Sequence, residues 1–99
     1  MSFTVVLDPR ALKDIQESIN YYDEQEPGLG KVFENNLDKH FKILKNNPFF
    51  QVRYDNVHCM PISKFPHMIH FTINEKRNEV VIRAIFHTSR DTKALKSRK

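Results

Sequence analysis

Two stretches of alternating apolar and polar residues constrain the fold most, because together they predict a β-hairpin. Residues 67–73 and 79–87 are rich in β-branched and aromatic side chains, and the polar turn 74–78 joins them. From Ile69 to Ile73 the odd-numbered positions are apolar and the even-numbered ones are polar. A one-residue slip moves every side chain of a strand to the other face, so burial of one face fixes the register.

Three apolar pairs coincide in the preferred register: Ile73 with Val80, Phe71 with Ile82, and Ile69 with Ala84. The same register sets His70 directly opposite Arg83. We expect helices to cover the apolar face and to leave the other face open. The side chains predicted on the open face are Met68, His70, Thr72, Arg83 and His87.

The first half of the chain predicts one short strand, residues 2–7, and two helices. Asp8 and Pro9 form a helix start, because Asp can cap free N–H groups and proline suits the first helical position. The first apolar stripe comprises Leu12, Ile15, Ile19 and Tyr22, and this helix should end near residues 24–26. The second stripe comprises Leu29, Phe33, Leu37, His40, Phe41 and Leu44, before the break at 46–48. The solvated outer faces are predicted to carry Lys13, Asp14, Glu17, Glu34, Asp38 and Lys42.

Residues 51–60 predict one further strand before the hairpin, although their alternation is weak. The expected element order is β-α-α-β-β-β. This order gives an α+β fold, with a helical hairpin packed on one face of a small, mostly antiparallel sheet. Residues 1–99 are expected to form a single domain, whose basic tail, 88–99, is either a short helix or flexible.

Composition excludes several classes of protein. No apolar run approaches the roughly 20 residues that span a membrane, and the N-terminus is unlike a signal peptide. Cys59 is the single cysteine, which leaves no internal disulfide and no cysteine-based metal site, so we expect a reducing, cytoplasmic location and no cofactor. The formal charge of +4 favours an acidic partner, either nucleic acid or an acidic protein segment, or serves solubility alone.

The predicted open face has a chemistry of its own. Arg83 offers a planar fork for phosphate or carboxylate, and histidines exchange protons near neutral pH. The alternative is that Arg83 pairs with a carboxylate of this chain and that the histidines fill space.

The last third of the chain carries a joint pattern, F-P-x-x-I-x-[FY]-x-I followed by V-x-I-x-A-[IV]-x-H-x-x-R-D. It comprises Phe65, Pro66, Ile69, Phe71, Ile73, Val80, Ile82, Ala84, Ile85, His87, Arg90 and Asp91, with Arg53 upstream. This pattern resembles the signature of the RelE/ParE toxin superfamily, especially its ParE-like branch. The resemblance covers nearly the whole chain, because the helical hairpin also fits the superfamily's element order.

The resemblance implies the toxin of a bacterial type II toxin–antitoxin system, of the kind associated with plasmid stabilisation and growth inhibition. Its implied partners are a cognate antitoxin and DNA gyrase, which ParE-like members inhibit without catalytic residues. The alternative is a RelE-like endonuclease that cuts mRNA on the ribosome. A third, weaker hypothesis is a basic nucleic-acid-binding module without toxicity. No small-molecule substrate, membrane or metal is implied.

Cleavage of RNA would require a base, a cation beside the phosphorane and an acid. Arg83 would be the cation, and His87 or His70 the acid or base. Arg53, Lys64 and Arg90 would contact phosphates or another target. The chain departs from RelE, because residues 58–61 lack its lysines and no tyrosine follows His87; a non-catalytic inhibitor is therefore favoured. We expect Met68 and Ile85 to stay partly bare until an acidic, amphipathic antitoxin segment covers them.

Overall fold

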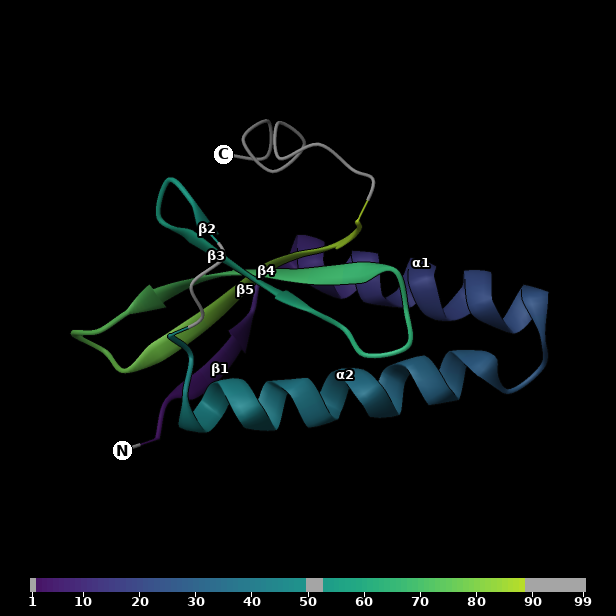
Figure 1. Cartoon of the computed structure of the whole chain (residues 1–99), viewed down its shortest axis with the longest axis horizontal. Helices are drawn as coiled ribbons and strands as arrows, with labels where there is room; N and C mark the ends of the chain where they lie inside the picture. The colour runs from purple at the N-terminus through teal and green to yellow at the C-terminus, as the bar shows by residue number, and fades with distance from the viewer. Residues whose placement is uncertain (1, 50–52, 89–99) are drawn as a thin grey trace.

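The computed structural model describes residues 2–49 and 53–88, and within them it confirms the predicted α+β fold. The chain runs through β1 (Thr4–Leu7), α1 (Pro9–Gln25), α2 (Leu29–Asn46), β2 (Arg53–Tyr54), β3 (Val57–Pro61), β4 (His67–Asn74) and β5 (Glu79–His87) (Figure 1). The sheet order is β1-β5-β4-β3-β2, with β1 parallel to β5 and every other pair antiparallel. The predicted tail lies outside the described residues, apart from Thr88.

Helix α1 begins as predicted, but it presents a different face to the sheet. Asp8 caps it by accepting a hydrogen bond from the backbone N–H of Arg10. The predicted stripe is wrong at Leu12, which is 50% exposed, whereas Ala11 is fully buried. Asp14, predicted on the outer face, is also buried. The small Ala11 allows a close approach to the sheet, and the Asp14 carboxylate finds a backbone partner there.

The partner of Asp14 is the backbone N–H of Ile85 on β5, at 3.0 Å. Strand β1 pairs with β5 only as far as Ile82. Beyond that residue, α1 replaces β1 alongside β5, and the Asp14 side chain accepts the hydrogen bond that a neighbouring strand would otherwise accept.

Helix α2 buries its predicted stripe and packs beside α1. The two helices approach each other closely at Gly30, because a Cβ there would lie 2.6 Å from the backbone oxygen of Ile19 and 2.8 Å from an Asp23 carboxylate oxygen. The N–H of Gly30 donates to that same carboxylate at 2.8 Å. Glycine is therefore required by packing rather than by its dihedral angles.

The prediction of one strand over residues 51–60 is wrong. The chain turns at Asp55 and Asn56 and divides into β2 and β3, which pair with each other. Asp55 has a φ of 50°, a left-handed conformation that Asp tolerates better than most residues. The weak alternation of this stretch reflects the turn inside it.

The β4–β5 register is as predicted near the turn and then shifts. Ile73 pairs with Val80, and Phe71 pairs with Ile82. A β-bulge follows, and His70 pairs with Ala84 rather than with Arg83, so the predicted His70–Arg83 pair is wrong. Arg83 is the additional residue of the bulge, which moves all later side chains of β5 to opposite faces.

The bulge allows β5 to contribute to two apolar clusters. Ile82 precedes the bulge and Ile85 follows it, and both belong to the main core beneath the helices. Ala84 and Phe86 face the other side, where they form a smaller cluster with Val57 and with the partly buried Tyr54. This second cluster occupies part of the face that was predicted to be open.

Candidate functional site

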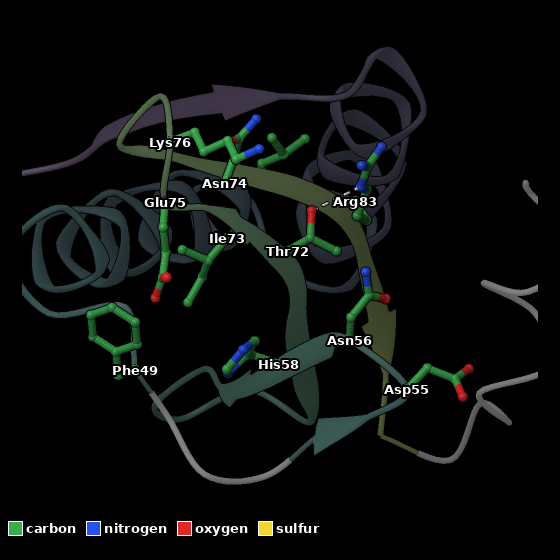
Figure 2. Close-up of a pocket in the computed structure, with 11 residues that line it drawn as sticks. Phe49, Asp55, Asn56, His58, Thr72, Ile73, Asn74, Glu75, Lys76 and Arg83 are labelled. Atoms are coloured by element: carbon green, nitrogen blue, oxygen red, sulfur yellow. Dashed lines mark hydrogen bonds between the residues drawn. The ribbon is translucent and has the colours of Figure 1, made fainter.

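An open hollow of about 770 Å³ lies where β4 extends past β3. The β3–β4 pairing ends at His58 and Phe71, so residues 72–74 pair with β5 alone. Figure 2 shows that the side chains around this edge come from the β2–β3 and β4–β5 turns, from strands β3, β4 and β5, and from Phe49 in the segment after α2. The lining residues are Phe49, Asp55, Asn56, His58, Thr72, Ile73, Asn74, Glu75, Lys76, Val81 and Arg83.

Arg83 is a fixed cation at this hollow. Its Nε donates to Thr72 Oγ1 at 3.2 Å, and Nη1 lies 3.6 Å from the Asp8 carboxylate (Figure 2 shows the bond to Thr72). The side chain is nevertheless 40% exposed. The hydrogen bond from the Arg10 side chain, helped by its charge and by that of Arg83, lowers the pKa of Asp8 to about 2. Arg83 thus pairs within the chain, as one alternative foresaw, while it still reaches solvent.

His70 is enclosed beneath the β2–β3 hairpin and is 5% exposed, although it was predicted on the open face. Its Nδ1 is hydrogen-bonded to the Tyr54 hydroxyl at 3.1 Å, and the Cys59 sulfur lies 3.5 Å from the same atom. Burial raises the pKa of Tyr54 to about 12 and also raises the pKa of the Cys59 thiol. Both neighbours therefore stay protonated at neutral pH.

His87 belongs to a second hollow, of about 380 Å³, between α1 and the ends of β4 and β5. The lining residues are Asp14, Glu17, Ser18, Tyr21, His67, Ile85 and His87. His67 pairs with His87 across the strands, and the ring centroids are 5.4 Å apart. Burial, together with the charge of His87, lowers the pKa of His67. The structure thus separates His87 from Arg83, because the bulge reverses the face that it occupies.

The remaining predicted residues are dispersed. Lys64 is exposed in the turn before β4, with a φ of 71°, and Arg53 begins β2 and pairs with His58. Arg90 lies outside the described residues. Met68 is partly exposed, as predicted, but Ile85 is 3% exposed, because the bulge turns it into the main core.

Phe49 lines the first hollow and Asp8 lies beside the Arg83 guanidinium, and neither residue was assigned to a site from the sequence. Asp8 was assigned as a helix cap alone, and Phe49 follows the break after α2; its side chain is 54% exposed. An aromatic ring directly after Asn-Pro is a signal that could have been noticed.

Within residues 2–49 and 53–88, no group of three His, Cys, Asp or Glu side chains could hold a metal ion. The described helices include none that is long and apolar enough to cross a membrane.

Comparison with solved structures identifies the fold. The fold is similar to the chromosomal ParDE toxin–antitoxin system from P. aeruginosa, with a TM-score of 0.74 at 14% identity over 87% of this chain and 96% of that one. It is also similar to an arginine-to-alanine double mutant of the E. coli toxin RelE in the free state, with a TM-score of 0.71 at 13% identity over 98% of this chain and 93% of that one. For the RelBE2 toxin–antitoxin complex from Mycobacterium tuberculosis the TM-score is 0.60 at 15% identity, over 88% of this chain and 99% of that one. These likenesses define a RelE/ParE-type toxin fold.

The sequence places the chain more narrowly within this class. Residues 5–92 match the family described as "ParE toxin of type II toxin-antitoxin system, parDE". No curated protein sequence matches the chain significantly. The chain belongs to the ParE toxin family.

Proposed function

We propose that this toxin acts by binding rather than by catalysis, and that its target is DNA gyrase. The distribution of the candidate acid–base groups carries the proposal. General acid–base catalysis needs its groups within hydrogen-bond reach of one substrate. Arg83 lines the first hollow, His70 is enclosed beneath Tyr54, and His87 lines the second hollow. Groups at three separate positions, one of them buried, are poorly placed to act together on one phosphodiester, which supports an inhibitor that binds its target.

A cognate antitoxin is the second partner in this proposal. The similar structures include a ParDE system and a RelBE2 complex, which supports such a partner here. An acidic, amphipathic segment would complement the charge of +4 and would cover the exposed Phe49 and the partly exposed Met68. In this proposal residues 1–99 act as one toxin domain in the cytoplasm, without a cofactor, and the chain aggregates when it is produced alone.

A ribosome-dependent mRNA endonuclease is the second candidate, because an imidazole and a cation share the first hollow. His58 stacks on Phe71, with ring centroids 5.4 Å apart, and it lines the hollow together with Arg83. On this alternative His58 would join or replace the histidines predicted from the sequence. Arg53, Lys64 and Arg90 would hold the RNA backbone.

Induced expression in sensitive cells separates the two functions. We expect a DNA-damage response with intact mRNA, and inhibition of supercoiling by purified gyrase. Rapid loss of mRNA with cuts in the ribosomal A site would contradict the proposal. A double variant, Arg83→Ala with His87→Ala, should remain toxic if it folds normally, and Lys76→Ala, an exposed cation at the same hollow, is the matched control.

A further inference from the structure

The turn between β3 and β4 holds a lysine in a conformation that lysine rarely adopts. Lys64 has a φ of 71°, and among the described residues the other two with positive φ, glycine apart, are Asp55 and Asn78. Asp and Asn tolerate the left-handed region better than other side chains, whereas a lysine there is strained. Such strain persists only where surrounding contacts fix the backbone, and it is concentrated at functional positions.

Helix α2 fixes this turn at Ser63, the residue before Lys64. The Asn36 side chain donates to the backbone oxygen of Ser63 at 3.0 Å, and the N–H of Ser63 donates to His40 Nε2 at 3.2 Å. His40 Nδ1 lies 2.6 Å from the backbone oxygen of Asn36, which can only accept, so Nδ1 carries the proton and Nε2 is free to accept. Two side chains one turn apart on α2 thus bind both backbone groups of Ser63, and Figure 1 shows the turn beside this helix.

Phe65, the residue after Lys64, is anchored by its ring. The ring lies edge-on to Tyr22 of α1 and to Phe33 of α2, with centroids 4.8 and 5.1 Å apart. The N–H of Phe65 also donates to the backbone oxygen of Ile62 at 3.4 Å, which closes the turn. Lys64 is therefore exposed between two anchored neighbours, and its backbone cannot relax without breaking one of these contacts.

The surface beside Lys64 is apolar, which favours a protein as the partner. Pro61 and Pro66 are exposed on either side of the turn, and the partly exposed Met68 pairs with Pro61 across the two strands. A charge next to apolar side chains is typical of the rim of a protein interface. Nucleic acid is bound instead through several cations that contact successive phosphates.

We propose that the 62–66 turn is a fixed contact element, in which Lys64 pairs with a carboxylate of a protein partner. Asn36 and His40 are positioning residues, because they act on the partner only through Lys64. Since the backbone is fixed before binding, little conformational freedom is lost when the ion pair forms. This inference rests on the proposed function in one respect, namely that the toxin acts by binding a protein.

Replacing Lys64 by glycine separates contact from structure, because glycine adopts a positive φ without strain. We expect Lys64→Gly to raise Tm by roughly 2–8 °C. The same variant should weaken inhibition of supercoiling by purified gyrase roughly two- to fivefold, as expected for one exposed ion pair. Lys64→Arg keeps the charge and should retain most of the inhibition. Lys13→Ala, which removes an exposed lysine of α1, is the matched control for the loss of one charge.

A double-mutant cycle tests the positioning residues. Asn36→Ala should weaken inhibition and speed amide exchange at Ser63, although it leaves the charge of Lys64 in place. In the Lys64→Gly chain, Asn36→Ala should cause no further loss of inhibition. Asn35→Ala, at an exposed neighbouring position of α2, is the matched control. His40→Gln retains an acceptor and should protect the Ser63 amide better than His40→Ala.

Several results would overturn the inference. Full inhibition by Lys64→Gly, or a Tm below that of the unaltered chain, would show that Lys64 serves the fold alone. An equal effect of Asn36→Ala in both backgrounds would remove its positioning role. Binding to a DNA duplex without gyrase that depends on Lys64 would replace the carboxylate by phosphate. If the unaltered chain does not inhibit gyrase, the proposed target is wrong, and growth arrest of induced cells provides the same comparison of Lys64→Gly with Lys13→Ala.

Discussion

The bond between Asp14 and Ile85 provides the sharpest test of how α1 and the sheet stabilise each other. Asp14 is 9% exposed, and its carboxylate accepts the N–H of Ile85 at 3.0 Å. Replacing it by alanine leaves a buried N–H without this acceptor, which costs about 1–3 kcal/mol. Alanine's higher helix propensity returns about 0.5 kcal/mol. Because the second hollow allows water to approach, we expect a net loss near the middle of this range, about 1–2 kcal/mol.

Urea denaturation of Asp14→Ala measures this loss, which should lower the midpoint without changing the slope. In a domain of this size, each kcal/mol corresponds to roughly 4–8 °C in Tm. Asp14→Asn keeps an acceptor oxygen and should lose less than half as much. Lys13→Ala, at an exposed position of the same helix, should change the free energy of unfolding by about 0.5 kcal/mol or less. If Asp14→Ala were as stable as Lys13→Ala, and amide exchange at Ile85 were unchanged, the Asp14 carboxylate would have no such role.

Three further predictions concern pH and packing. The folded-state pKa of His67 lies below its ordinary value of 6.5, so its contribution to stability should be complete above pH 6.5 and should be lost as the pH decreases through the lowered pKa. His67→Gln should flatten this part of the plot of unfolding free energy against pH. An unchanged slope in the variant would show that His67 does not cause this pH dependence. Asp8 has a pKa of about 2 in the folded state, against an ordinary value of 3.8, so it should contribute stability that is present above pH 3.8 and is lost as the pH falls through 2. At pH 7, Asp8→Asn should keep the helix cap and should therefore cost less than Asp8→Ala, by about 1 kcal/mol in thermal unfolding. Gly30→Ala should destabilise the fold by about 1–3 kcal/mol, because its Cβ would lie 2.6 Å from a backbone oxygen. Gly28→Ala has open space around its Cβ and should cost about 1 kcal/mol through its φ of 90° alone. Similar denaturation midpoints for the two variants would show that the α1–α2 contact is not tight.

The helices and the hairpin turn could be predicted because their signals are local. Periodicity located the stripe of α2, and Asp8 followed by Pro9 located the start of α1. The position of Asp14 could not be predicted in this way, since its partner is a backbone group 71 residues away. A prediction from the hydrophobic pattern alone places such a carboxylate on the solvent-exposed surface.

The candidate site was predicted in part for a similar reason. Arg83 does lie at an open hollow, but a single register was extended past it to His70 and His87. The consecutive apolar residues Ala84, Ile85 and Phe86 were a usable signal, because such a run indicates a strand buried on both faces. A bulge has no such periodic signature, and it was therefore missed.

The bulge at Arg83 also matters for comparing this chain with its relatives. One additional residue changes the parity of β5, so side chains before and after it follow opposite odd–even rules. A related strand of the same length without a bulge, in which the equivalent of Arg83 paired regularly, would direct the equivalents of Ala84 and Phe86 towards the helices and the equivalent of His87 away from them. At identities of 12–15%, an alignment that places gaps elsewhere would equate side chains in opposite environments. Functional residues near the end of this strand should therefore be transferred between family members only after the bulge has been located in each.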